Sequence, residues 1–147
     1  MSDVVCDISE WEDYNKDLLF LIEETMPREC KKFMRREGGR LRTVSKQTAR
    51  STVNKKTGNY LASIKASRSW RNSRGGYGVY VFTSRPPGFH AHLLEYGHRV
   101  YRRGVPTAKR ARAFHIMENA NRVFESRFWK DCDTFIGQMV DDGMKGK

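Results

Sequence analysis

Residues 113–141 form the stretch AFHIMENANRVFESRFWKDCDTFIGQMVD, which decides the fold class. Its apolar residues recur at three- and four-residue steps, which places them on one face of a helix. They are Met117, Ala120, Phe124, Phe128, Cys132, Phe135, Ile136 and Met139. We therefore expect a C-terminal helix over residues 113–141 that packs across a sheet.

The N-terminal region, residues 9–53, is also predicted to be helical. Ser9 and Glu12 have the spacing of a capping box, so a helix should begin at Ser9. An apolar stripe follows, made of Trp11, Tyr14, Leu18, Leu21 and Ile22. Pro27 should end or kink this helix because it lacks an amide, and the Gly38-Gly39 pair should break the next run or act as a hinge. Residues 40–53 have few apolar side chains, so a helix there should be weakly anchored, and either mobile or ordered by a partner.

The middle of the chain, residues 57–112, alternates with the period of strands. Alternating apolar positions are Tyr60, Ala62, Ile64 and Ala66, then Tyr77, Val79 and Val81. They predict two half-buried strands joined by a hairpin loop over residues 67–76. A short helix over 89–96 should end at Gly97, and residues 99–112 read as a basic loop with a short strand near Val100.

Together these elements predict an α+β fold. A small antiparallel sheet is packed by the long C-terminal helix, with helices at the N-terminus. The chain has 147 residues, which suits one compact core, so residues 1–147 are expected to form a single domain.

The net charge of +11 is unevenly distributed along the chain. Residues 1–27 hold eight Asp or Glu and one Lys, whereas residues 28–112 hold 22 Lys or Arg and only three Glu. Residues 113–147 are nearly neutral, with five Lys or Arg and six Asp or Glu. The basic middle implies an acidic partner, either nucleic acid or a neighbouring protein surface. A solvated basic face kept for solubility is the alternative.

The sequence favours a protein that stays in the compartment where it is made. No apolar run approaches the roughly 20 residues of a membrane helix, and the acidic N-terminus does not resemble a signal peptide. The three cysteines, Cys6, Cys30 and Cys132, have no C-x-x-C spacing. We expect a soluble protein without a membrane partner, and reduced thiols made in a cytoplasm.

Catalytic chemistry is not expected. The sequence contains no nucleophile elbow and no phosphate-binding loop. His90, His92, Glu95 and His98 suggest a metal site, but the spacing does not direct these side chains to one point on a helix. We therefore predict no enzyme, no catalytic residue, no metal ligand and no cofactor. Glu95 is instead expected to be structural or interfacial, with a charge-assisted hydrogen bond to a cationic neighbour.

Nucleic-acid contact is a separate hypothesis. Arginines bind phosphates and aromatic rings stack on bases. Both kinds occur together at Arg68, Trp70, Arg71, Arg74 and Tyr77, and a second basic pair lies at Arg102 and Arg103. No sequence-reading motif accompanies them, so a small basic protein that binds nucleic acid without sequence specificity is the alternative function.

Three segments occur in an order that resembles one protein family. They are KTGNYLASI at residues 56–64, HLLEYG at residues 92–97 and RAF at residues 112–114. This order is similar to the head-tail joining family of long-tailed bacteriophages, which includes neck, tail-completion and minor tail proteins. The matching residues are Thr57, Gly58, Leu61, Ile64, Glu95, Tyr96, Gly97, Arg112 and Phe114. The chain departs from the family at Ala113 and at Asn54-Lys55, where proline is usual.

The resemblance implies a structural virion protein, made in the cytoplasm of a bacterial host. Such a protein forms a homo-oligomeric ring, hexameric or dodecameric, in the neck that connects head to tail around the DNA channel. Its partners would be itself, the head-closure proteins and the tail-terminator or tail-tube proteins. Packaged DNA would be contacted without sequence specificity. The residues expected at the DNA channel or between rings are Arg68, Trp70, Arg71, Arg74, Arg102 and Arg103.

Overall fold

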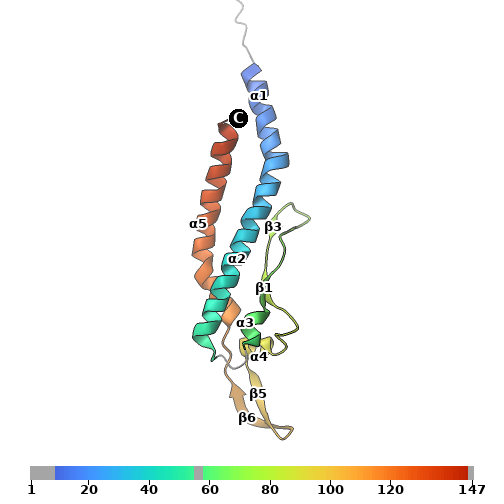
Figure 1. Cartoon of the computed structure of the whole chain (residues 1–147), viewed down its shortest axis with the longest axis vertical. Coiled ribbons are helices and arrows are strands. Elements are labelled where there is room, and N and C mark those ends of the chain that lie inside the picture. The colour runs from blue at the N-terminus through green and yellow to red at the C-terminus, as the bar shows by residue number, and fades with distance from the viewer. Residues whose placement is uncertain (1–8, 55–57, 146–147) are drawn as a thin grey trace, which may run out of the picture.

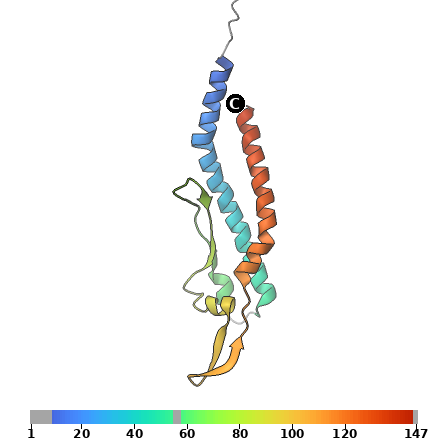
Figure 2. The ribbon, with the colours of Figure 1, turned by 180° about the vertical axis from the view of Figure 1, so that it is seen from behind.

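A computed structural model describes residues 9–54 and 58–145. α1 (Ser9–Phe20), a π-helical turn η1 (Leu21–Thr25) and α2 (Met26–Thr52) follow one another without a break. α5 (Ile116–Met144) lies beside this helical path (Figure 1), and the view from behind gives the same arrangement (Figure 2). The mixed α+β class predicted from the sequence is confirmed, in a molecule built on one long pair of helices.

Pro27 lies inside the helical path. Because proline has no amide, the carbonyl of Glu23 loses its α-helical donor. The preceding turn is π-helical, and the Met26 amide donates to the Leu21 carbonyl. This wider turn leaves room for the proline ring. The helix was expected to end or kink at Pro27. It continues instead, with a local change of hydrogen bonding.

The glycine pair and the polar segment after it are also helical, so α2 is not broken at Gly38-Gly39 as expected. Gly38 is buried because the α2 backbone passes directly against the side chain of Val79. Further along α2, the hydroxyl of Ser45 donates to the Leu41 carbonyl at 2.9 Å, so this buried side chain needs no outside partner. Small residues thus anchor α2 by allowing close approach, where the sequence suggested a hinge and a mobile stretch.

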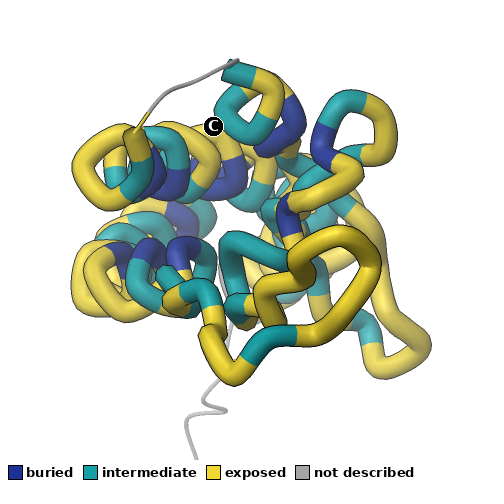
Figure 3. Tube along the Cα trace, turned by 90° about the horizontal axis from the view of Figure 1, so that it is seen from below, coloured by how far each residue is buried: buried dark blue, intermediate teal, exposed yellow. Residues whose placement is uncertain are grey.

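The α2–α5 contact forms the upper core. Phe33 stacks on Phe135 with ring centroids 4.5 Å apart, and Phe128 lies 6.2 Å from Phe33. Ala120 and Phe124 on α5 are buried in the same helix pair. Figure 3 shows that exposed residues cover most of the outer surface. α5 packs mainly on α2, so the expectation that it would cross a sheet is corrected.

The lower core joins the end of α2 to the short elements. Ala49, Ile64 and Ile116 are fully buried there. Around them pack Val53, Tyr60, Leu61, Val81, Phe114 and Met117. Residues Asn59–Ser63 wind into one helical turn, α3, instead of the predicted strand. A helical turn lets the consecutive residues Tyr60 and Leu61 both reach the core, whereas a strand would point them to opposite faces.

In the described part of the chain, the strands form three separate two-stranded sheets instead of one. β1 (Ile64–Ala66) pairs with β4 (Val81–Thr83), and β2 (Trp70–Arg71) pairs with β3 (Tyr77–Gly78). The predicted loop over residues 67–76 is thus partly paired. α4 (Ala91–Tyr96) is the expected short helix. The basic loop expected over 99–112 is a hairpin, β5 (His98–Arg102) with β6 (Val105–Ala111).

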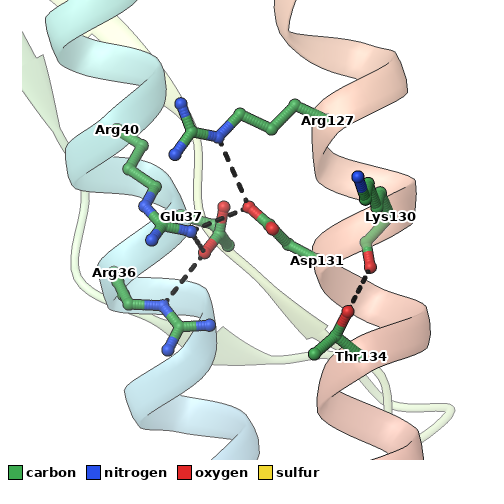
Figure 4. Close-up of polar contacts among 7 residues, drawn as sticks. All are labelled: Arg36, Glu37, Arg40, Arg127, Lys130, Asp131 and Thr134. Atoms are coloured by element: carbon green, nitrogen blue, oxygen red, sulfur yellow. Dashed lines mark hydrogen bonds and ion pairs between the residues drawn. The ribbon is translucent and has the colours of Figure 1, made fainter.

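A charged network fixes the register of α2 against α5 (Figure 4). Glu37 is 2% exposed, and its Oε1 accepts from Arg36 at 3.1 Å and from Arg40 at 2.8 Å. The Arg40 Nη1 atom also donates to Asp131 on α5 at 2.8 Å, and Arg127 lies 3.6 Å from the same carboxylate. Burying a carboxylate without a cation beside it costs free energy. The two helices are therefore held in the register in which Arg40 contacts both Glu37 and Asp131.

The adjacent glycines of α2 provide a test of this packing. Gly39→Ala should raise the free energy of unfolding by about 0.5–1 kcal/mol, because alanine favours helix and a Cβ there meets no atom within 4 Å. Gly38→Ala should lower it, because its Cβ would overlap Val79 and overpacking costs about 1–3 kcal/mol. Chemical denaturation measures both variants. Equal stability of the two variants would contradict the close contact between Gly38 of α2 and Val79.

Candidate functional site

The carboxylate of Glu95, in the segment at residues 92–97, links the segment at residues 56–64 to the first turn of α5, which follows the segment at residues 112–114. Glu95 lies on α4, and its Oε1 accepts a hydrogen bond of 2.6 Å from the hydroxyl of Tyr60 on α3. Both carboxylate oxygens lie 3.3 Å from the amide of Met117, in the first turn of α5. The first amides of a helix have no partner within it, and a negative charge there is favourable. Glu95 therefore caps α5 from another element.

Backbone hydrogen bonds strengthen the same junction. The Phe114 amide donates to the Leu94 carbonyl at 2.9 Å, and the His115 amide donates to the Glu95 carbonyl at 3.2 Å. Gly97 directly follows α4 with φ 68°, and a Cβ at this position would lie 2.5 Å from the Ala111 carbonyl oxygen. Only glycine combines this conformation with this approach. The segment Glu95–Gly97 is thus fixed from both sides.

Tyr60 serves this junction as a hydrogen-bond donor. Burial raises the pKa of its hydroxyl, and the hydrogen bond to Glu95 and that residue's negative charge raise it further. The phenol consequently keeps its proton across the neutral range. A protonated phenol that donates a hydrogen bond to a carboxylate is a stable structural pair.

The other residues of the three segments have different positions. Gly58 has φ 77° and precedes α3, while Leu61, Ile64 and Phe114 lie in the lower core. The Arg112 guanidinium lies 5.9 Å from the centre of the Phe114 ring. Tyr96 is 75% exposed and takes no part in the junction. Thr57 lies outside the described residues. Most of the motif residues therefore build the junction or the core beneath it.

Glu95 was expected to bind one of its cationic neighbours, and this expectation is wrong. Its partners are the Tyr60 hydroxyl and the Met117 amide. A hollow of about 340 Å³ lies next to it. The hollow is lined by Phe82, Thr83, His92, Glu95, Tyr96, His115, Met117 and Glu118. The Glu95 carboxylate binds the Met117 amide because this amide has no partner within α5 and is fixed in position, whereas exposed cationic side chains are flexible.

The basic residues singled out from the sequence fall into two groups on separate hairpins (Figure 1). Arg68, Trp70, Arg71 and Arg74 belong to the hairpin of β2 and β3, where the Arg71 guanidinium lies 5.6 Å from the centre of the Tyr77 ring. Arg102 and Arg103 lie at the tip of the β5–β6 hairpin. The structure therefore offers two distinct basic surfaces, each exposed.

Other chemistry can be assessed only for the described part of the chain. Among residues 9–54 and 58–145, no three His, Cys, Asp or Glu side chains are grouped so as to hold a metal ion. Burial raises the pKa of the Cys30 and Cys132 thiols, and nearby carboxylates add to the shift. Both thiols are therefore weak nucleophiles. In the same residues, no helix is long and apolar enough to cross a membrane.

Sequence reasoning missed two members of the junction. Tyr60 was read as a strand residue facing a core, and the Met117 amide carries no side-chain signal at all. The available signal was the tyrosine itself. A tyrosine that is expected to face the core needs a hydrogen-bond partner for its hydroxyl. The Arg36–Glu37–Arg40–Asp131 network was missed as well, since Asp131 lies far from the other three residues in the sequence.

No protein-family model, curated protein or solved structure matches this chain.

The junction predicts a specific coupling between Tyr60 and Glu95. Tyr60→Phe and Glu95→Gln should each lower the free energy of unfolding by about 1.5–3 kcal/mol, the usual worth of a hydrogen bond to a charged group. The double variant should lose less than the sum, because both changes remove the same bond. Urea denaturation of the four proteins measures the coupling. Strictly additive losses would show that the bond does not link the two segments.

Tyr96→Phe is the matched control, because its exposed hydroxyl should be worth less than about 0.5 kcal/mol. Alkaline pH gives a second readout. The raised pKa of Tyr60 means that the unfolded chain loses this proton first, near the ordinary value of 10.0. Its contribution to stability is therefore complete below that pH and declines as the pH rises above it. The decline should be smaller in Tyr60→Phe.

Proposed function

We propose that this chain is a non-enzymatic structural subunit of a long-tailed bacteriophage. It forms a ring in the neck that connects the head to the tail around the DNA channel. The observation that carries the proposal is the Glu95 junction, where the three segments that resemble the head-tail joining family meet. Tyr60 donates to the Glu95 carboxylate, and the Phe114 amide donates to the Leu94 carbonyl. Segments that act as a single structural unit are a better basis for a resemblance than separate short motifs.

The chemistry of the junction suits a structural role. Both oxygens of Glu95 accept hydrogen bonds, and its donor Tyr60 keeps its proton. Groups held in this way fix elements in place, whereas a general acid or base needs a free proton site facing a substrate. The residues of the junction position α5 and the β5–β6 hairpin.

The charge distribution supports assembly of many copies. The acidic α1 and the basic hairpins lie on different parts of an elongated subunit (Figure 1). Opposite charges on separate faces favour contacts between copies and with neighbouring rings. In this proposal the partners are other copies of the chain, the head-closure proteins, and the tail-terminator or tail-tube proteins. Assembly takes place in the host cytoplasm and the final location is the virion.

One observation favours the alternative of a small basic protein that binds nucleic acid without sequence specificity. The β5–β6 hairpin places Arg99 opposite Arg110, and residues 98–112 contain no acid. Like charges at such a position are unfavourable unless an anion lies between them. The phosphates of DNA could supply it, either in a virion channel or in free DNA.

The purified protein distinguishes the two functions. At about 150 mM salt we expect native mass spectrometry to show hexamers or dodecamers, and negative-stain electron microscopy to show closed rings with a central channel. Binding to a random-sequence DNA duplex should be weak at this salt, because exposed charges are screened. A protein that stays monomeric and binds the duplex tightly would instead support the nucleic-acid-binding alternative.

A further inference from the structure

One end of the molecule, here called the acidic tip, exposes an apolar run to solvent. Residues 18–22 read LLFLI, and Leu19, Phe20 and Ile22 are 56%, 62% and 52% exposed. Leu21 alone is directed inward, against Gly143 at the end of α5. Consecutive exposed apolar residues are unfavourable in water and usually mark an interaction surface.

Acids surround this apolar run. Asp17, Glu23 and Glu24 are exposed and form no ion pair among the described residues. Asp17 and Asp142 line one groove together with Phe20. Arg28, Lys32 and Arg36 line the same groove further along α2, but each is already paired with Glu29 or Glu37. The acidic tip therefore combines unpaired negative charge with exposed apolar surface.

The β5–β6 hairpin has the complementary properties. Arg99 lies directly opposite Arg110, and these arginines form no ion pair in the described part of the chain. Tyr101 and Val105 are 63% and 64% exposed on the same hairpin. An isolated two-stranded hairpin is marginally stable in water, and opposed like charges weaken it further. The hairpin therefore requires an acidic partner that also covers apolar side chains.

The two surfaces lie at opposite ends of the subunit, so they cannot meet within one chain (Figures 1 and 2). We infer that the β5–β6 hairpin of one copy docks on the acidic tip of the next copy. This head-to-tail contact would be the repeating interface of the assembly, and in that respect it rests on the proposed function. Contacts of this type close into rings or continue as filaments, depending on the rotation between copies.

A second copy suits the hairpin better than DNA does. A phosphate backbone neutralises arginines but offers no apolar surface to Tyr101 and Val105. The acidic tip offers both carboxylates and the apolar residues Leu19, Phe20 and Ile22. Burying apolar side chains supplies binding energy, while the charges set the orientation of the copies.

Two variants test this contact, and each has the charge reversed at one end of the subunit. Variant T carries Glu23→Lys and Glu24→Lys at the acidic tip, and variant H carries Arg102→Glu and Lys109→Glu on the hairpin. All four side chains are exposed and unpaired in the described residues, so both variants should fold. Circular dichroism checks the fold, and native mass spectrometry at about 150 mM salt measures assembly.

Each variant alone should be reduced to monomers, or to assemblies at least tenfold weaker than those of the unmodified chain. In a mixture of the two, assembly should return with T and H alternating, because the acidic tip of H meets the basic hairpin of T and the reversed tip of T meets the reversed hairpin of H. Leu19→Ser with Ile22→Ser should also weaken assembly, which tests the apolar part of the contact. The matched controls are Arg68→Glu with Arg74→Glu on the other hairpin and Glu125→Lys on α5, and both should assemble normally.

The outcomes separate this inference from the proposed function. If the unmodified chain forms rings and variants T and H form them equally well, the head-to-tail contact is wrong while the ring proposal remains. If T and H pair in the mixture but the unmodified chain builds open filaments, the contact is correct and the ring is wrong. A variant H that assembles normally but loses binding to a DNA duplex would assign the hairpin to nucleic acid and overturn the inference.

Discussion

The carboxylate of Glu95 accepts hydrogen bonds from Tyr60 on α3 and from the first turn of α5. Without it, the amide of Met117 would be left without a partner at a half-buried helix end, and the Tyr60 hydroxyl would be buried without an acceptor. The position of α5 relative to α3 and α4 therefore depends on this one group. The β5–β6 hairpin depends on it as well, because the hairpin leaves and re-enters the fold between Gly97 and Arg112.

The upper half of the molecule is held in a different way. Phenylalanine contacts and the Glu37–Arg40–Asp131 network fix α2 on α5, but little covers the outside of this helix pair. Two helices alone cannot bury every apolar residue that they carry, and Leu19, Phe20 and Ile22 remain exposed. A subunit that leaves apolar surface at one end and unpaired arginines at the other is suited to assembly. In the proposed function, a single chain is one segment of a larger ring.

The sequence predicted the elements with long periodic signals and failed where a residue acts through its neighbours. The spacing from Met117 to Met139 predicted α5, and Gly97 marked the end of α4. The meaning of Gly38 could not be predicted, because a glycine that permits close packing looks the same as one that permits a hinge. Its role depends on Val79, which lies in another segment.

The candidate site was only partly predicted, again because its residues act through neighbours from other segments. Glu95 stands out as a rare acid in a basic region, and its structural role was expected. Its partners were not, since a backbone amide and a phenol leave weaker traces in a sequence than nearby histidines and arginines. The two basic hairpins were identified as charged, but their separation follows from pairing registers that composition does not contain.

Electron cryomicroscopy of virions purified from host cells that produce this chain, with the neck resolved, tests the central claim most directly. The account predicts a ring of copies around the DNA channel between head and tail, each with the α2–α5 pair and the Glu95 junction recognisable in the density. Particles that carry a complete neck without this chain, while the protein remains in the host cytoplasm, would contradict it.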